Sequence, residues 1–259
     1  SGSSGDYSII RLNTITECEC VGTTPERALK RSTDLLAHCP TAPTGWYWLE
    51  VAGTPREVYI DCDYDGGGWV LVASHPRDIS LPSLTYAQAA QGSSSFYSTR
   101  PSGVDDPKMY AYWMGLEAWT GITAANNAGN NVVSYVSSTQ VSLGATSDHT
   151  KRAAWKWDGW DTGYSWKNPN SIQLLLGDVN PGLYSYSAIN GYKFSTIDHD
   201  QDLRSGSCAS LYKEAPWWYA NCWSGSAWGG NGGHSTYLNA WYWVSSSTDN
   251  HNYGALYIK

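Results

Sequence analysis

Long apolar runs and an excess of basic residues are both missing from this 259-residue sequence. No run of about 18 apolar residues occurs, so we expect no membrane insertion. The chain has 16 Lys and Arg against 23 Asp and Glu, and this net charge of -7 argues against a nucleic-acid partner bound through its phosphates. Charged residues reach only 15% and hydrophobic residues 41%, which excludes a highly charged, disordered chain.

Several catalytic and metal-binding motifs are also missing. The sequence has no Cys-x-x-Cys and no His-x-x-x-His, so we expect no zinc site. It has no Gly-x-Ser-x-Gly, no His-Glu-x-x-His and no phosphate loop, so we predict that the protein is not an enzyme. A glycosidase is the remaining enzymatic alternative, because Asp158 and Asp161 lie among tryptophans and that reaction needs two carboxylates.

The N-terminal end lacks an initiator Met and a charged-then-apolar leader, so we expect a mature or trimmed chain. Its first five residues are Ser and Gly only, as in flexible linkers. We therefore divide the chain into a flexible or oligomerisation arm, residues 1–22, and one domain, residues 23–259.

Phenylalanine is scarce, whereas tryptophan and tyrosine are abundant. The chain has 2 Phe, 15 Trp and 19 Tyr, so nearly every aromatic side chain carries a polar atom. Such rings suit surfaces where one edge packs and the other forms hydrogen bonds. This composition favours a binding surface for polar, flat ligands such as sugars, and a Trp-rich core is the alternative.

The even number of cysteines indicates disulfides and therefore an extracellular, secreted protein. We predict a Cys208–Cys222 bridge, which closes a short loop and should stabilise the fold by about 3 kcal/mol. Cys39–Cys62 is the next most plausible pair. Cys18 and Cys20 are then left to link chains in a covalent homo-oligomer; alternatively, one of them pairs with Cys39 or Cys62.

Local patterns predict one helix followed by strands. Thr23 and Glu26 form a capping box that predicts a helix ending before Pro40. Runs of aromatic and β-branched residues then predict strands, and a glycine-rich turn falls at residues 66–68. The predicted strands cover residues 46–51, 58–60, 69–72 and 132–141; residues 110–119 form a possible short helix, residues 172–176 are a short apolar segment, and loops dominate after residue 180.

Alternate carboxylates in residues 198–202 predict a calcium loop. Asp198, Asp200 and Asp202 would repel one another, and calcium binds six to eight oxygens, including backbone carbonyls. An EF-hand is excluded, because its sixth and twelfth positions would be Leu203 and Ala209. A solvated turn is the alternative for this loop. The similar Asp-rich run at residues 61–66 lies between predicted strands and indicates turn chemistry.

Three segments together resemble one family. Residues 62–69 are Cys-Asp-Tyr-Asp-Gly-Gly-Gly-Trp, and residues 112–116 are Tyr-Trp-Met-Gly-Leu. Residues 194–202, Cys208-Ala209 and residues 217–222 complete the pattern. In this order they resemble the fibrinogen-like domains of fibrinogens, ficolins and tachylectins, over about residues 32–259. Residues 39–74 are also similar to intelectins, which share this beginning.

The resemblance implies an α+β fold. It consists of a small N-terminal helix and hairpin subdomain, a central twisted antiparallel sheet and a loop-rich, calcium-binding C-terminal subdomain. The family's N-terminal cysteine position is Ser32 here, so a shifted bridge from Cys39 is expected. By the same resemblance, Asp200 and Asp202 are calcium ligands through their side chains. Arg204 and Gly206 are ligands through their carbonyls. Asp198 contacts the ligating residues without touching the ion, or binds it through water.

The resemblance also implies a pocket for acetylated sugars beside the calcium loop. Tyr212 and Tyr237 match two wall tyrosines, and Asn221-Cys222 matches a cis peptide that aims N–H groups at the acetyl oxygen. Trp223 stands where the family usually has His, and His234 belongs to a matching His-Ser-x-Tyr segment.

We therefore expect a secreted lectin that recognises acetylated glycans such as GlcNAc or GalNAc, including those on microbial surfaces. Calcium is the expected cofactor, and several sites on a homo-oligomer would supply avidity. The first alternative is a protein-binding or adhesion module. The second is an intelectin-like lectin in which calcium contacts sugar diols.

Overall fold

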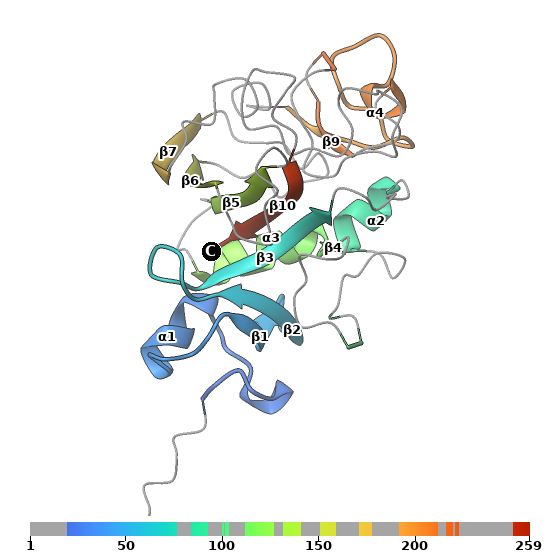
Figure 1. Ribbon diagram of the computed structural model, residues 1–259. Coiled ribbons are helices and arrows are strands. Elements are labelled where there is room, and N and C mark those ends of the chain that lie inside the picture. Colours follow the sequence, from blue (N-terminus) through green and yellow to red (C-terminus); the bar gives the residue numbers. More distant parts are fainter. Residues whose placement is uncertain are drawn as a thin grey trace, which may run out of the picture.

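A computed structural model of the chain describes most of the N-terminal half and selected segments of the rest (Figure 1). The described residues are 20–76, 84–92, 100, 102–103, 112–126, 132–140, 151–158, 171–177, 192–211, 216–219, 221–222 and 251–259. In residues 75–76, 132–140, 151–158, 171–177 and 251–254 this description covers the backbone only. The helices within these ranges are too short or too polar to cross a membrane.

The described elements follow a mixed order of short helices and strands. The helices are η1 (Pro25–Arg27), η2 (Ser32–Asp34), α1 (Leu35–His38), α2 (Tyr86–Gln91), α3 (Leu116–Asn126) and α4 (Cys208–Leu211). The strands are β1 (Gly45–Val51), β2 (Thr54–Asp61), β3 (Trp69–Pro76), β4 (Tyr112–Trp113), β5 (Val132–Gln140), β6 (Lys151–Asp158), β7 (Ser171–Gly177), β8 (Phe194–Ser195), β9 (Trp217–Trp218) and β10 (His251–Ile258).

The first hairpin confirms the predicted strands. β1 and β2 pair antiparallel, and Ala52 and Gly53 form the two-residue turn with φ angles of 49° and 81°. Two positive φ angles match the right-handed twist of the flanking strands. Tyr47, Leu49 and Val51 alternate on the buried face of β1, as the period of two requires.

The single helix predicted for residues 23–39 is wrong. The segment contains two 3-10 turns and one turn of α-helix, and Leu29 between them pairs in parallel with Leu49 of β1. The N–H of Leu29 donates to Trp48 O at 2.9 Å, and that of Glu50 donates to Leu29 O at 2.8 Å. Tertiary pairing thus overrides local helix signals. Thr23 Oγ1 donates to Cys20 O instead of capping a helix.

The glycine-rich turn between β2 and β3 fits tightly against the N-terminal helices. A Cβ atom at Gly67 would lie 2.6 Å from Leu36 Cδ1 and 2.8 Å from Cys62 O, and its φ of 68° also favours glycine. Asp61 Oδ1 accepts the N–H groups of Asp63 and Tyr64 at 2.8 and 3.1 Å, which confirms turn chemistry for this Asp-rich run.

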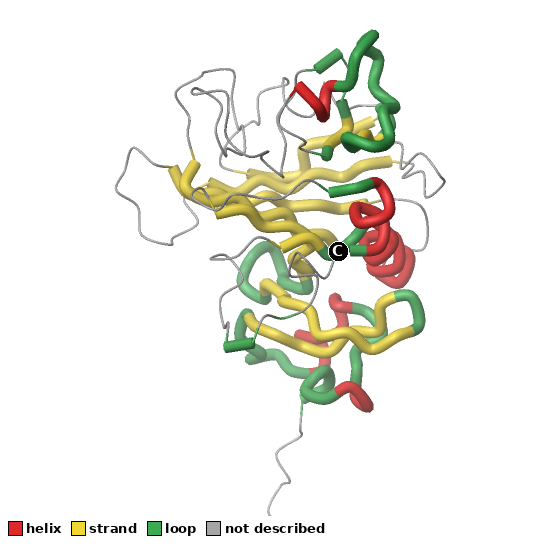
Figure 2. Tube along the Cα trace, turned by 90° about the vertical axis from the view of Figure 1, so that its right-hand side faces the viewer, coloured by secondary structure: helices red, strands yellow, loops and turns green. Residues whose placement is uncertain are grey.

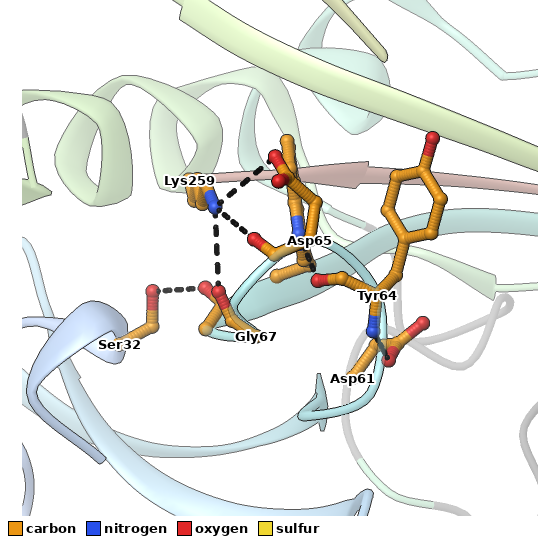
Figure 3. A network of polar contacts seen from close by, with 8 residues as sticks. Ser32, Asp61, Tyr64, Asp65, Gly67 and Lys259 are labelled. Carbon is orange, nitrogen blue, oxygen red and sulfur yellow. Dashed lines mark hydrogen bonds and ion pairs between the residues drawn. The ribbon is translucent and has the colours of Figure 1, made fainter. Parts of the chain in front are cut away.

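Lys259 closes the same turn from the end of β10 (Figure 3). Its Nζ donates to Asp65 O at 2.9 Å and lies 4.1 Å from the ring centroid of Trp69. Ser32 Oγ donates to Gly68 O at 2.7 Å and accepts a hydrogen bond from Asn126 Nδ2 at 2.9 Å. These contacts join the N-terminal turns, the start of β3 and the end of α3.

A large antiparallel sheet forms the middle of the molecule. Its strand order is β1-β2-β3-β10-β5-β6-β7, and β4 pairs with β3. β5 confirms the strand predicted at residues 132–141, and β7 covers the short apolar segment at residues 172–176. β10 was not predicted, yet it joins β3 to β5. Figures 1 and 2 show α3 beside this sheet and the α4 segment at the opposite end of the molecule from α1.

An aromatic cluster connects the sheet to the C-terminal segment. The ring centroids of Trp113 and Trp119 lie 5.2 Å apart, and Trp119 and Trp218 lie 6.1 Å apart. Phe194 completes the cluster at 4.8 Å from Trp218, and all four side chains are buried. Of the short helix considered for residues 110–119, the described part is β4 followed by the first turn of α3. These tryptophans are therefore core residues, and together they fix β8 and β9 on the rest of the domain.

The disulfides confirm one prediction and correct another. Cys208 pairs with Cys222, as predicted, with 4.9 Å between their Cα atoms. Cys39 pairs with Cys20 instead of Cys62, and their Cα atoms lie 5.6 Å apart. The end of α1 brings Cys39 to the segment before η1, so Cys62 keeps a free, half-buried thiol. The proposed interchain role of Cys20 is therefore wrong, and Cys18 lies outside the described residues.

Candidate functional site

The acidic loop, residues 198–202, follows a short two-stranded sheet. β8 pairs with β9, and the chain then reverses through the Thr196–His199 bridge. Gln201 ties the loop back to β8, because its N–H donates to Ser195 Oγ at 3.0 Å and its Nε2 donates to Phe194 O at 2.8 Å. Asp200 and Asp202, on either side of Gln201, therefore lie on backbone that is fixed to β8, whose Phe194 belongs to the aromatic cluster.

Asp200 and Asp202 lie together and shape the loop that leads to α4. Asp202 Oδ1 accepts the N–H of Arg204 at 2.8 Å, and its Oδ2 accepts the N–H of Cys208 at 2.7 Å. Asp200 Oδ1 accepts the N–H of Asp202 at 3.2 Å. Burial raises the pKa of Asp202, and the adjacent Asp200 carboxylate adds to the increase, although the two N–H groups oppose it. The two carboxylates therefore repel each other.

Asp198 is directed toward α2. Its Oδ1 accepts the N–H of Tyr86 at 2.9 Å and the hydroxyl of Thr196 at 2.7 Å. The ring of Tyr86 also packs against His199 with 4.2 Å between centroids. Tyr86 was not a predicted site residue, because it lies 112 residues before Asp198 and no local pattern connects them. Asp198 thus links the acidic loop to α2.

The Cys208–Cys222 bridge places Asn221 beside the acidic loop. Asn221 is exposed, whereas Cys222 is buried. The predicted cis peptide is wrong: the Asn221–Cys222 bond is trans, and no cis bond occurs among the described residues. The chain turns here through the left-handed φ of 76° at Cys222 instead. Arg204 reaches this corner, because its Nη1 donates to Cys222 Sγ at 3.2 Å.

The donor set of the loop fits calcium better than a softer metal. Within the described ranges, no group of three or more His, Cys, Asp or Glu side chains is placed to hold a metal. A cation here would therefore use Asp200 and Asp202 with backbone carbonyls and water, which is the oxygen-rich shell that calcium prefers. The space around Gly206 is open, which leaves its backbone accessible. The crowding of two carboxylates is the observation that favours a cation.

The remaining predicted ligand residues fall outside the described part of the chain. These residues are Tyr212, Trp223, His234 and Tyr237. The glycosidase alternative named Asp158 and Asp161. Asp158 ends β6 opposite Ser171, and Asp161 lies outside the described residues. The described residues of the candidate site are therefore the acidic loop, Arg204, the disulfide and Asn221.

A disulfide-closed C-terminal segment attached to a large antiparallel sheet defines an α+β domain. The family model for the C-terminal globular domain of fibrinogen beta and gamma chains matches residues 43–254. The chain therefore belongs to this family of fibrinogen-like domains, as its motifs predicted. The family is one of non-enzymatic binding modules.

Curated relatives include a lectin and several larger proteins. Techylectin-5A of Tachypleus tridentatus is 28% identical, over 76% of this chain and 59% of that protein. Fibrinogen-like protein 1-like protein of Gallus gallus is 28% identical, over 70% of this chain and 59% of that protein. Tenascin-N of Mus musculus is 26% identical over 70% of this chain, which is only 10% of tenascin-N. The chain thus corresponds to part of each relative.

Solved structures support the fold. The fibrinogen-like globe domain of human ANGPTL6 aligns with a TM-score of 0.61 at 21% identity, covering 89% of this chain and 95% of that domain. Lamprey fibrin D-dimer, complexed with a Gly-His-Arg-Pro-amide peptide, aligns with a TM-score of 0.60 at 15% identity, covering 95% of this chain and 79% of that one. At such identities the likeness establishes the fold alone.

Proposed function

We propose that this domain is the recognition part of a secreted lectin that binds acetylated glycans and is stabilised by calcium. The observation that carries the proposal is the crowded Asp200–Asp202 pair, fixed next to the disulfide that holds Asn221. The similarity to a techylectin supports carbohydrate as the ligand class. Disulfides suit an oxidising, extracellular compartment.

In this proposal Asp200 and Asp202 would hold the ion, and the carbonyls of Arg204 and Gly206 would complete its protein ligands. Bound calcium would neutralise the repulsion between the two carboxylates and stiffen the loop. Asp202 already orders the backbone through its two accepted N–H groups, and Gln201 fixes the loop to β8. A rigid loop reduces the entropy lost when a sugar binds beside it.

The sugar would lie next to Asn221, with aromatic side chains packing on its C–H surface. Tyr212, Trp223, His234 and Tyr237 are the proposed contacts. Single sugar sites are weak, so we also propose a homo-oligomer whose repeated sites add avidity. Cys18 is the remaining candidate for a covalent link between chains, and microbial surface glycans are the proposed targets.

A glycan array probed in calcium and in chelator tests this function. We expect binding to acetylated sugars in calcium and its loss in chelator. Asp200→Asn should reproduce the effect of chelator. Asp63→Asn is the matched control, because Asp63 is also an exposed Asp in a turn and its bond from Thr44 survives in Asn. Equal binding by the Asp200→Asn variant and the wild type would contradict the proposed role of calcium.

A protein-binding or adhesion module is the second candidate. Ile197, Leu203 and Leu211 are the large hydrophobic side chains exposed among the described residues, and all three lie in the C-terminal segment. Exposed apolar side chains in one segment favour a protein partner. Failure to bind any glycan would favour this candidate. Binding of sugars that lack acetyl groups but carry vicinal diols would instead favour direct contact with calcium, as in intelectins.

A further inference from the structure

Asp198 holds its own turn of the acidic loop against α2. Its Oδ1 accepts the N–H of Tyr86 at 2.9 Å and the hydroxyl of Thr196 at 2.7 Å. Thr196 and His199 also exchange backbone hydrogen bonds of 3.0 and 3.3 Å, so residues 196–199 form a closed turn. The ring of His199 packs on that of Tyr86 with 4.2 Å between centroids. The turn therefore meets α2 through one backbone hydrogen bond and one ring contact.

The helix α2 is itself attached to the core. Ala89 is buried, and its carbonyl accepts the indole N–H of Trp113 at 2.9 Å. Trp113 also contacts Phe194 of β8, with 6.0 Å between ring centroids. A capping box fixes the first turn of α2, since Thr85 Oγ1 accepts the N–H of Gln88 and Gln88 Oε1 accepts the N–H of Thr85. Because α2 and β8 are attached to the same core residue, α2 gives the turn a rigid support.

The two proposed calcium ligands are positioned from different sides. The oxygens of Asp202 accept two N–H groups from residues that follow it in the chain. Asp200 lies between the turn of residues 196–199 and Gln201, which is tied to β8. The tilt of that turn therefore decides the direction in which the Asp200 side chain leaves the backbone. The relative placement of the two carboxylates thus depends on α2 as well as on the loop itself.

We propose that the hydrogen bond from Tyr86 N to Asp198 positions Asp200 for calcium, so that α2 helps to set the affinity for the ion. This inference rests on the calcium site of the proposed function and adds a positioning residue to it. Asp198 Oδ1 already accepts two hydrogen bonds, and its role is to fix the turn without touching the ion. A calcium site binds more tightly when its oxygens are held in place beforehand, because less entropy is then lost on binding.

Tyr86→Pro removes this N–H group and should leave the helix in place. Proline is favoured at the first position of a helix, which Tyr86 occupies in α2. Thr85 before it has φ and ψ angles of −68° and 161°, the extended conformation that a residue before proline prefers. Tyr86→Leu is the matched variant, because it also loses the ring but keeps the N–H. Neither substitution changes the charge of the site.

Calorimetric titration with calcium alone compares the two variants, each with and without Asp198→Ala. We expect Tyr86→Pro to bind calcium about tenfold more weakly than Tyr86→Leu, since a hydrogen bond to a charged group is lost. With Asp198→Ala the ratio of the two Kd values should be near one, because the acceptor is gone. Denaturant unfolding in chelator separates positioning from folding, because a merely structural bond would lower stability there and leave the calcium Kd unchanged.

Several results would overturn the inference. Equal calcium Kd values for Tyr86→Pro and Tyr86→Leu exclude positioning by this bond, and a difference that survives Asp198→Ala shows that another contact causes it. Loss of all calcium binding with Asp198→Ala alone identifies Asp198 as a ligand of the ion and not as a positioning residue. Each of these results leaves calcium binding by the wild type, and with it the lectin proposal, intact. Absence of calcium binding to the wild type overturns the proposed calcium site itself.

Discussion

Removal of the Asp202 carboxylate should destabilise the domain, and by more in calcium than in chelator. Asp202→Asn keeps one oxygen, so it retains one of the two accepted N–H groups, from Arg204 or from Cys208. A hydrogen bond to a charged group contributes about 1.5–3 kcal/mol, and the partial exposure of Asp202 places the loss near the lower end. Relief of the repulsion from Asp200, which helps to raise the pKa of Asp202, offsets part of this loss in chelator.

Denaturant unfolding in calcium and in chelator measures both effects. We expect a loss of about 1 kcal/mol in chelator and at least about 3 kcal/mol in calcium, since a ligand at 100 times its Kd adds about 2.7 kcal/mol to the wild type. Asp63→Asn should show no dependence on calcium. Equal losses for Asp202→Asn under the two conditions would exclude Asp202 as a calcium ligand. No loss in chelator would refute the hydrogen-bond argument.

Three further predictions concern the scaffold. Gly115→Ala should cost about 3 kcal/mol or more in thermal unfolding, because its φ is 98° and a Cβ atom would lie 2.4 Å from Gly92 N. Gly45→Ala should be nearly neutral, because nothing lies within 4 Å of its Cβ position; similar losses for both variants would contradict this reasoning. Burial, with Asp61 and Asp63 nearby, raises the pKa of Cys62 to about 11 from 9.0, so its thiolate at pH 8 should be about a hundredfold rarer than in the unfolded chain. Peptide mapping after timed alkylation should find Cys62 slow in the native protein and fast in denaturant, and equally fast labelling in both would refute the burial. The same shift should lower stability as the pH rises from 9 toward 11, because the unfolded thiol ionises first.

The first hairpin could be predicted because its signals are local. Alternation in β1 and the glycine at position 53 of its turn follow from backbone geometry, and the structure contains both. The helix prediction at Thr23 failed because Leu29 takes a place beside β1, which depends on residues twenty positions away. The Cys39–Cys62 prediction failed for a similar reason, since pairing depends on where the end of α1 lies.

The acidic loop could be found from its alternate carboxylates, but its connections could not. The bond from Tyr86 N to Asp198 and the contact of Arg204 with Cys222 both depend on the tertiary fold. β10 was missed although residues 255–258 are a short apolar run, because its first half, residues 251–254, carries no strand pattern and pairs only through β3 and β5 on its two sides. Such a strand is specified mainly by its neighbours.

The central position of β10 has a consequence for the order in which the domain can fold. β3 and β5 are both hydrogen-bonded to β10 and not to each other, so the sheet stays in two parts until residues 251–258 emerge from the ribosome. During that interval each part has an open edge, which can pair with a second nascent chain. Folding should therefore be slow, as expected where distant segments must meet, and cells producing this domain should depend on chaperones that shield strand edges.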